Sequence, residues 1–252
     1  MVYYIGTTSG LRRAEKHQAS PSYRNPIGGK HENYTGISIH ELSYSAWRRA
    51  FDFGKAPMTS PEFMLYVFNE FFVDLVDKEL SQEPVKTALN STHFDLVFIE
   101  FLMFPSINAL AHKFQAPLIG MSSLDILVPG HLLIGNPVNP AYFADPLLGH
   151  SDKKTFLERV RTTLFIGFWY FFYQYMVLPK HDAIAKKHFG PDTPYVGDIE
   201  KNMSLVLANS DFITGYPKPE VPAYVSIGGG NAIHLKKPQP LPKVSYYQKI
   251  GL

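Results

Sequence analysis

The sequence predicts an α/β protein with an incomplete Rossmann-like parallel sheet flanked by helices. An apolar run at residues 94–99 ends in a single carboxylate, Glu100. It is followed by a helical segment that begins at Pro105 and by a second short apolar run at residues 117–121. Strand, helix and strand in this order are typical of a βαβ unit, in which the two strands are parallel.

The sequence signals for secondary structure before this unit are weaker. Residues 1–30 show no sustained period and are expected to form loop. Residues 35–42 alternate between apolar and polar positions, which predicts a short strand. The Ser60-Pro61-Glu62 start and the helical spacing of apolar residues that follows predict a helix up to about Leu80.

After the unit, residues 129–146 are rich in Pro, Gly and Asn. So long a connection is usually functional, and we expect it to form part of a binding wall. A helical block is predicted over residues 152–189, interrupted at Pro179. Two further buried strands are predicted at residues 203–208 and 225–228.

Composition excludes several functions. The 252 residues carry 24 Lys and Arg against 22 Asp and Glu, a net charge of +2, and no basic stripe suited to nucleic acid. Without cysteine there is no disulfide, thiolate zinc site or cysteine nucleophile, and we expect no metal site. The apolar start at residues 1–5 is too short for a signal peptide.

Three N-x-S/T sequons begin at Asn33, Asn90 and Asn202. Only a chain in the secretory lumen could carry glycans there, whereas chance also produces such triplets. Both interpretations stay open at this point.

Glu100 is the candidate catalytic residue. In open α/β sheets the ligand crevice lies outside the carboxyl ends of the strands, which is where Glu100 is expected. There it could act as a general base or orient a histidine that does so. The alternative is a capping or salt-bridged carboxylate at the edge of the sheet.

Residues 164–178 are apolar and rich in aromatic side chains. The block is shorter than the ~20 residues that span a bilayer. Its Trp and Tyr content suits a helix lying at the membrane interface, where Phe168, Trp169 and Phe172 would contact lipid. A buried helix packed on the sheet explains the same composition, and both interpretations stay open.

Six segments in order resemble the N-terminal, acceptor-binding half of animal UDP-glycosyltransferases of the UDP-glucuronosyltransferase type. They are NYT at 33–35, FDLVFIE at 94–100, GNPVNPAYF at 135–143, DPLLG at 145–149, LANS at 207–210 and KPQPLP at 237–242. The resemblance implies one half of a protein with two facing Rossmann-like domains. The family transfers glucose or glucuronate from a UDP-sugar, held by the C-terminal half, to small lipophilic acceptors held by the N-terminal half.

The resemblance also implies roles and a location. Catalysis in the family pairs a histidine base with a carboxylate that orients it, and Glu100 stands at the carboxylate position, where many members have Asp. The histidine belongs to a loop upstream of anything matched here. No cofactor is expected to bind this half. Family members work on the lumenal side of the endoplasmic reticulum membrane.

These matches divide the chain into an unmatched segment at residues 1–30, an acceptor-binding domain at 31–235 and a linker at 236–252, with the second domain absent. We therefore expect a truncated transferase that is inactive alone, and a sheet left unpaired where the first family strand is missing. The alternative is a non-catalytic short isoform that binds the membrane or forms an oligomer with a full-length relative. A third possibility is a stand-alone binder of lipophilic ligands.

Overall fold

The computed structural model describes residues 3–6, 16–20, 34–39, 41–43, 45–46, 48, 61–91, 93–145, 147–211 and 216–228. Its sheet has seven strands in the order β3-β2-β1-β4-β5-β6-β7. In chain order they are β1 (Tyr3–Gly6), β2 (Lys16–Ser20), β3 (Tyr34–Ser38), β4 (Leu96–Glu100), β5 (Leu118–Ser122), β6 (Leu205–Ala208) and β7 (Tyr224–Ser226).

The half of the sheet from β4 to β7 is parallel throughout, as the sequence predicts. Burial alternates along these strands: Val97 and Ile99 of β4 are buried, and so are Leu118 and Gly120 of β5. This period of two places one set of apolar side chains against the helices. The four predicted strands are thus confirmed: β4, β6 and β7 are one or two residues shorter than predicted, and β5 is shifted by one residue.

The N-terminal strands correct two expectations. β1 and β2 lie within residues 1–30, for which loop is predicted, and β1 pairs antiparallel with both β2 and β4. Strand β4 is therefore paired on both sides, and the expected unpaired position beside it is filled. Short strands such as β2, with the sequence KHQAS, owe their conformation to pairing, here with β1 and β3, and pairing leaves no local period in the sequence.

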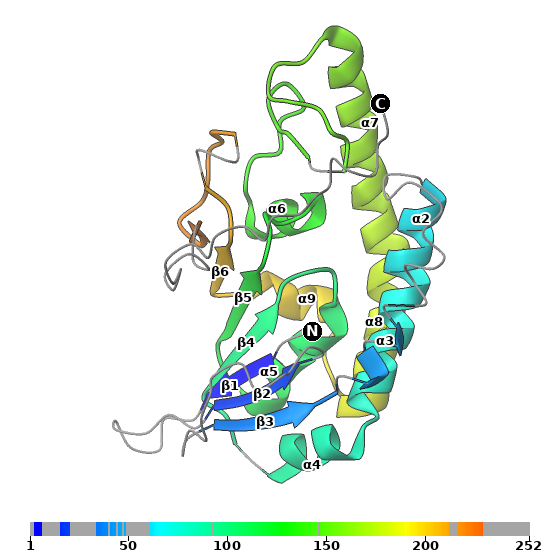
Figure 1. The fold of residues 1–252 in the computed structure, drawn as a ribbon, viewed down its shortest axis with the longest axis vertical. Helices are drawn as coiled ribbons and strands as arrows, with labels where there is room; N and C mark the ends of the chain where they lie inside the picture. The colour runs from blue at the N-terminus through cyan, green and yellow to red at the C-terminus, as the bar shows by residue number, and fades with distance from the viewer. Residues whose placement is uncertain are drawn as a thin grey trace, which may run out of the picture.

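The helices form a long column beside the sheet. α7 (Phe156–Phe172), the π-helical turn η3 (Tyr173–Val177) and α8 (Leu178–Phe189) run along the long axis of the molecule, beside α2 (Pro61–Tyr66) and α3 (Phe72–Leu80) (Figure 1). The other helical elements are η1 (Val67–Phe71), α4 (Glu83–Ser91), η2 (Pro105–Asn108), α5 (Ala109–Phe114), α6 (Val128–Ile134) and α9 (Val196–Lys201).

The predicted interruption at Pro179 is a change of helix type. Proline has no N–H, and its ring crowds the carbonyl one turn earlier. The column widens just before it, where the Leu178 N–H donates to the Tyr173 carbonyl, five residues back. This π-turn accommodates the proline while α7 and α8 stay continuous.

Part of the predicted loop at residues 129–146 is also helical. α6 begins with Pro129 in its first turn, where a missing N–H costs nothing. It ends at Gly135, whose φ of 82° lies in the left-handed region that glycine adopts without strain. Only the part after Gly135 forms an extended loop.

The aromatic block is largely core. Trp169 is fully buried, with its ring centroid 5.0 Å from that of Phe68, and Phe172 is 3% exposed. The expectation that Trp169 and Phe172 contact lipid is therefore wrong for this packing, because both side chains are buried in the hydrophobic core. Phe168 is 40% exposed. Within the described residues, no helix has the length and hydropathy needed to cross a membrane.

Candidate functional site

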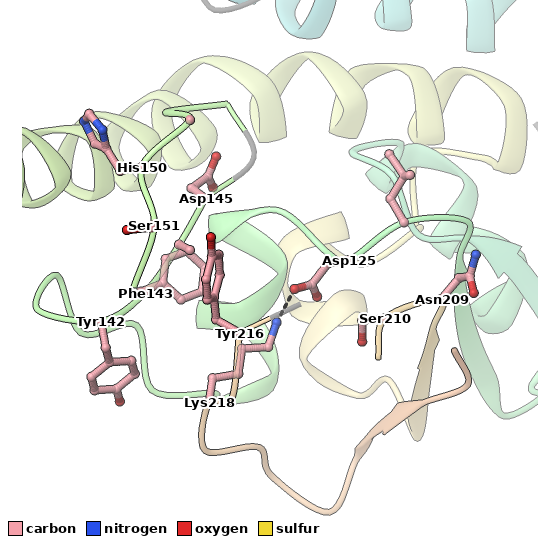
Figure 2. Close-up of a pocket in the computed structure, with 13 residues that line it drawn as sticks. Asp125, Tyr142, Phe143, Asp145, His150, Ser151, Asn209, Ser210, Tyr216 and Lys218 are labelled. Atoms are coloured by element: carbon pink, nitrogen blue, oxygen red, sulfur yellow. Dashed lines mark hydrogen bonds and ion pairs between the residues drawn. The ribbon is translucent and has the colours of Figure 1, made fainter. Parts of the chain in front are cut away.

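A cavity of about 480 Å³ opens at the carboxyl ends of β5 and β6. Leu124 and Asp125, which follow β5, form one wall, and Asn209 and Ser210, which follow β6, form another. Residues 142–145 and 149–151 close a third side, and Tyr216 with Lys218 a fourth (Figure 2). The position agrees with the general place of ligand sites in open α/β sheets, and the volume is that of a small-molecule site.

Side-chain turns hold the long loop in place. The Asn139 side chain accepts from the Ala141 N–H at 2.9 Å, and Asp145 Oδ1 accepts from the Leu147 N–H at 2.8 Å. Lys154 Nζ donates to the carbonyl oxygens of Pro140 and Phe143. Asn and Asp favour such turns because their side chains mimic a backbone acceptor. The sequence of the loop therefore fixes this wall of the cavity.

Asp125 is the centre of a polar cluster between the loop and the sheet. Its carboxylate accepts from Lys218 Nζ and, at 2.6 Å, from the Tyr224 hydroxyl, and it lies 3.4 Å from His131 Nε2 (Figure 2 shows the contact with Lys218). Burial opposes its charge. The hydrogen bonds and the Lys218 ammonium outweigh that effect and hold the pKa of Asp125 well below its ordinary value.

The protonation of His131 follows from its neighbours. The Val221 N–H donates to Asn136 Oδ1 at 2.7 Å, so the amide nitrogen of Asn136 faces His131 Nδ1 at 3.0 Å. Nδ1 then accepts, Nε2 carries the proton, and the ring donates to Asp125. Burial lowers the pKa of His131, which agrees with this neutral form. The cluster joins α6, residues 218–221 and β7 around one carboxylate.

Asp145 is the second carboxylate of the cavity. Its side chain is 2% exposed, and Oδ2 accepts no hydrogen bond from the residues that the structure describes. Burial raises the pKa of Asp145 to about 6. His150 also lines the cavity. Its Nδ1 lies 3.7 Å from Oε1 of Glu158, a residue that does not line the cavity.

Glu100 lies one strand away from the cavity. It ends β4, is half-buried, and accepts from Ser123 Oγ at 3.3 Å, next to the cavity residues Leu124 and Asp125. Glu100 itself is not among the cavity-lining residues. Its position at the carboxyl edge of the sheet is as expected, and its catalytic role stays a prediction.

The two sequons within the described residues are not part of the cavity lining. Asn90, in α4, is exposed and accepts from Lys113 Nζ at 2.8 Å. Asn202 is exposed at the end of α9, and its amide donates to the Asp198 carbonyl. Asn33 and the linker predicted at 236–252 lie outside the described residues.

Sequence reasoning did not single out the charged cavity residues Asp125, Asp145 and Lys218, or Tyr224, which donates to Asp125. The rule that selects Glu100, a polar residue just past a strand, also selects Asp125, three residues after β5. No such local signal exists for Lys218, which meets Asp125 from 93 residues away. Across the described residues, no three His, Asp or Glu side chains gather in a way that could hold a metal ion.

The parallel strands β4 to β7, with a cavity beyond the ends of β5 and β6, define a Rossmann-like ligand-binding domain. The profile of one family, described as UDP-glucoronosyl and UDP-glucosyl transferase, matches residues 42–251. The match covers most of the chain, and the chain therefore belongs to this family of transferases.

Individual proteins similar to this chain support the same family. The chain is similar to UDP-glycosyltransferase UGT4 of Dactylopius coccus, with 30% identity over 185 residues, which are 71% of this chain and 36% of the relative. UDP-glucosyltransferase 2 of the same insect is 34% identical over 164 residues, 64% of this chain and 31% of the relative. Human UDP-glucuronosyltransferase 2B10 is 24% identical over 191 residues, 74% of this chain and 35% of the relative. The chain spans about a third of the length of these relatives. No solved structure matches it.

Proposed function

We propose that this domain is the acceptor-binding half of a UDP-glycosyltransferase, and that a small lipophilic acceptor occupies the cavity at the carboxyl ends of β5 and β6. The cavity carries the proposal. Leu124, Tyr142, Phe143 and Tyr216 supply apolar and aromatic surface, and a few polar groups are placed among them. This mixture is typical of sites that bind small organic ligands.

Glu100 is the proposed catalytic carboxylate of the domain. In the family role it would orient a histidine and stabilise its charge while the acceptor hydroxyl loses its proton. Ser123 holds it at the same edge of the sheet as the cavity. The described residues supply this carboxylate and an acceptor cavity, and we assign none of them to the UDP-sugar. We therefore propose that the chain binds an acceptor without transferring a sugar to it.

Binding can be tested by calorimetry with 2-naphthol, a lipophilic phenol. Ala144 lines the cavity, whereas Ala141 is exposed and does not line it. Ala144→Phe should fill the space and weaken binding by at least about tenfold, with Ala141→Phe as the matched control. If both variants bind 2-naphthol equally well, the acceptor does not occupy this cavity.

The transfer step has its own assay. The parent chain is incubated with 2-naphthol and either UDP-glucose or UDP-glucuronate, and the products are separated by chromatography. No naphthyl glycoside is expected. A product that disappears in Glu100→Ala would show that the chain is active alone and uses this carboxylate.

A second proposal concerns the outer face of α7 and η3. Leu164, Phe168, Phe171 and Tyr175 recur every three or four residues and are 69%, 40%, 60% and 72% exposed. They form an exposed strip beside the buried side of the helix, where Phe168 stacks on the buried Phe172. Arg159, Arg161 and Lys180 flank this stretch in sequence and are exposed. Aromatic surface with flanking cations suits an anionic membrane surface.

Flotation with phosphatidylserine vesicles tests this attachment. The variant Leu164→Ser/Phe168→Ser/Phe171→Ser should lose flotation, whereas Val225→Ser/Ile227→Ser, changed at exposed apolar positions on and after β7, should keep it. High salt should weaken the binding of the parent. If the parent does not float but is retained by an immobilised full-length relative, the face binds protein, as the non-catalytic alternative requires.

We further propose the lumenal side of the endoplasmic reticulum membrane as the location. Exposure of Asn90 and Asn202 is compatible with glycans at both. When the chain is directed into the secretory pathway, a glycosidase-sensitive mass increase should shrink stepwise in Asn90→Gln and Asn202→Gln. An unmodified parent chain would leave these sequons as chance triplets.

A further inference from the structure

A second cavity adjoins the proposed acceptor cavity, at the carboxyl ends of β6 and β7. Its volume is about 400 Å³, which is within the range of small-molecule sites. The two cavities share four lining residues: Asp125, Ser210, Tyr216 and Lys218. They therefore meet at one wall, and a ligand with two parts could be shared between them.

The lining of the second cavity differs in kind from that of the first. The first cavity has the apolar side chains of Leu124, Phe143 and Ala144. The residues that line only the second cavity are Asp211, Pro217, Glu220, Ser226 and Gly228. Among these five, only Pro217 has an apolar side chain. A polar lining of this kind suits a group rich in hydroxyls, not a second lipophilic group.

Two adjacent parallel strands hold the serine hydroxyls of this cavity. Ser226 ends β7 and is paired with Ala208, the last residue of β6, and Ser210 follows two residues later. A Cβ on Gly228 would lie 2.6 Å from the carbonyl oxygen of Ser210. Only glycine therefore allows the chain after β7 to approach the chain after β6 this closely. The strand ends thus fix the positions of both serines.

The hydrogen bonds of the cluster use up its hydroxyl protons. Tyr224 donates its only hydroxyl proton to Asp125, so Ser210 Oγ must donate to the Tyr224 oxygen at 2.7 Å. The Ser226 hydroxyl then donates to Ser210 at 2.9 Å or to the Glu220 carboxylate at 3.4 Å. Hydroxyl and carboxylate oxygens accept more than one hydrogen bond each. The oxygens of Ser210, Ser226 and Glu220 can therefore accept from a ligand that brings its own donors.

We propose that the second cavity binds a sugar that the acceptor already carries, so that the domain takes lipophilic glycosides. This inference rests on the proposed function, because it places the lipophilic part of the glycoside in the first cavity. A sugar brings several hydroxyl protons to a wall whose oxygens can accept them, and its own oxygens stay open to water.

Two ligands that differ only in the sugar test this proposal: 2-naphthol and 2-naphthyl β-glucoside. In calorimetry with the full 252-residue chain, the glucoside should bind about tenfold more tightly than 2-naphthol, because its hydroxyls add hydrogen bonds in the second cavity.

The double variant Glu220→Ala/Ser226→Ala removes two acceptors that line only the second cavity. Both residues are exposed, so the variant is expected to fold, which thermal unfolding checks. It should lose the gain from the sugar and keep the parent's affinity for 2-naphthol. Glu83→Ala/Ser204→Ala, at an exposed glutamate and an exposed serine outside both linings, is the matched control and should keep the gain.

The donor is the other possible source of a sugar in this cavity. An excess of UDP-glucose should leave the affinity for the naphthyl glucoside unchanged, because the proposed occupant is the sugar of the acceptor. Displacement of the glucoside by UDP-glucose would assign the cavity to the donor sugar and overturn the inference.

Two further results overturn the inference alone: a glucoside that binds no more tightly than 2-naphthol, or a gain that persists in Glu220→Ala/Ser226→Ala. In both cases 2-naphthol still binds, and the proposed acceptor site stands. If neither ligand binds, the proposed function fails, and this inference fails with it.

Discussion

Two polar clusters of this domain use similar residues and differ in charge. Beside the cavity, Asp125 is paired with the ammonium of Lys218 and with the Tyr224 hydroxyl. In the core, Glu200 accepts from the Tyr173 hydroxyl at 2.6 Å and from the Asn108 amide at 3.0 Å, with no cation among these partners. The pKa of Asp125 is held low, whereas burial raises that of Glu200 to about 7.

The core cluster anchors the turn that follows β4. Asn108 and Ser106 both belong to η2, and Ser106 Oγ lies 2.9 Å from Nδ1 of the fully buried His181 in α8. Burial lowers the pKa of His181 to about 3, so the ring is neutral. A buried carboxylate thus keeps its charge where a cation is supplied and takes up a proton more readily where only neutral donors surround it. Charge is retained at the cavity, and neutral hydrogen bonds hold the core.

The largest expected effect breaks the charged cluster. Asp125→Ala leaves Lys218, Tyr224 and His131 without their shared acceptor and should lower the free energy of unfolding by about 3 kcal/mol. Asp74→Ala is the matched control, because it removes an exposed pair with Lys78 and should cost under about 1 kcal/mol. Urea unfolding followed by circular dichroism measures both. Equal losses would mean that the Asp125 cluster is no stronger than a surface ion pair.

The sequence predicts the parallel half of the fold because each of those strands is an apolar run of its own. β4, β5, β6 and β7 need no knowledge of their neighbours, whereas β1 and β2 exist through pairing: β1 with β2 and with the distant β4, and β2 with β1 and β3. The same limit applies to the site. Position at the end of a strand identifies Glu100 and could have identified Asp125, but the approach of Lys218 and the burial of Asp145 depend on the conformation of long loops.

The next effect is a pH dependence that separates the two clusters. The pKa of Glu200 rises from 4.5 to about 7 on folding, so the folded state binds the proton more tightly. The contribution of Glu200 to stability is complete below about pH 4.5 and is lost as the pH rises toward 7, at up to about 1.4 kcal/mol per pH unit. Glu200→Gln mimics the protonated acid and should flatten this slope.

Other groups titrate in the same range. The pKa values of Glu79 and Asp145 are also raised, and His181, with its lowered pKa, acts in the opposite direction. The measurement is therefore the difference between parent and Glu200→Gln in urea unfolding from about pH 4.5 to 7. The difference between the parent and Asp125→Asn should be constant above about pH 4 and shrink below it, because the lowered pKa of Asp125 stabilises the fold only until its carboxylate is protonated. A difference for Glu200→Gln that does not change with pH would show that Glu200 is ionised in the core.

The smallest effect tests whether the core cluster is neutral throughout. Ser106→Ala removes one hydrogen bond to His181 and should cost about 1 kcal/mol, with Ser204→Ala, at an exposed serine, as the control. Because the pKa of His181 is about 3, the ring stays neutral from about pH 5 to 8, and the loss should be constant over that range and insensitive to salt. The cost of Asp125→Ala should instead fall below about pH 4, where the Asp125 carboxylate becomes protonated and its stabilising charge is lost. A loss for Ser106→Ala that varies between pH 5 and 8 would place a charge beside His181 and remove the distinction between the two clusters.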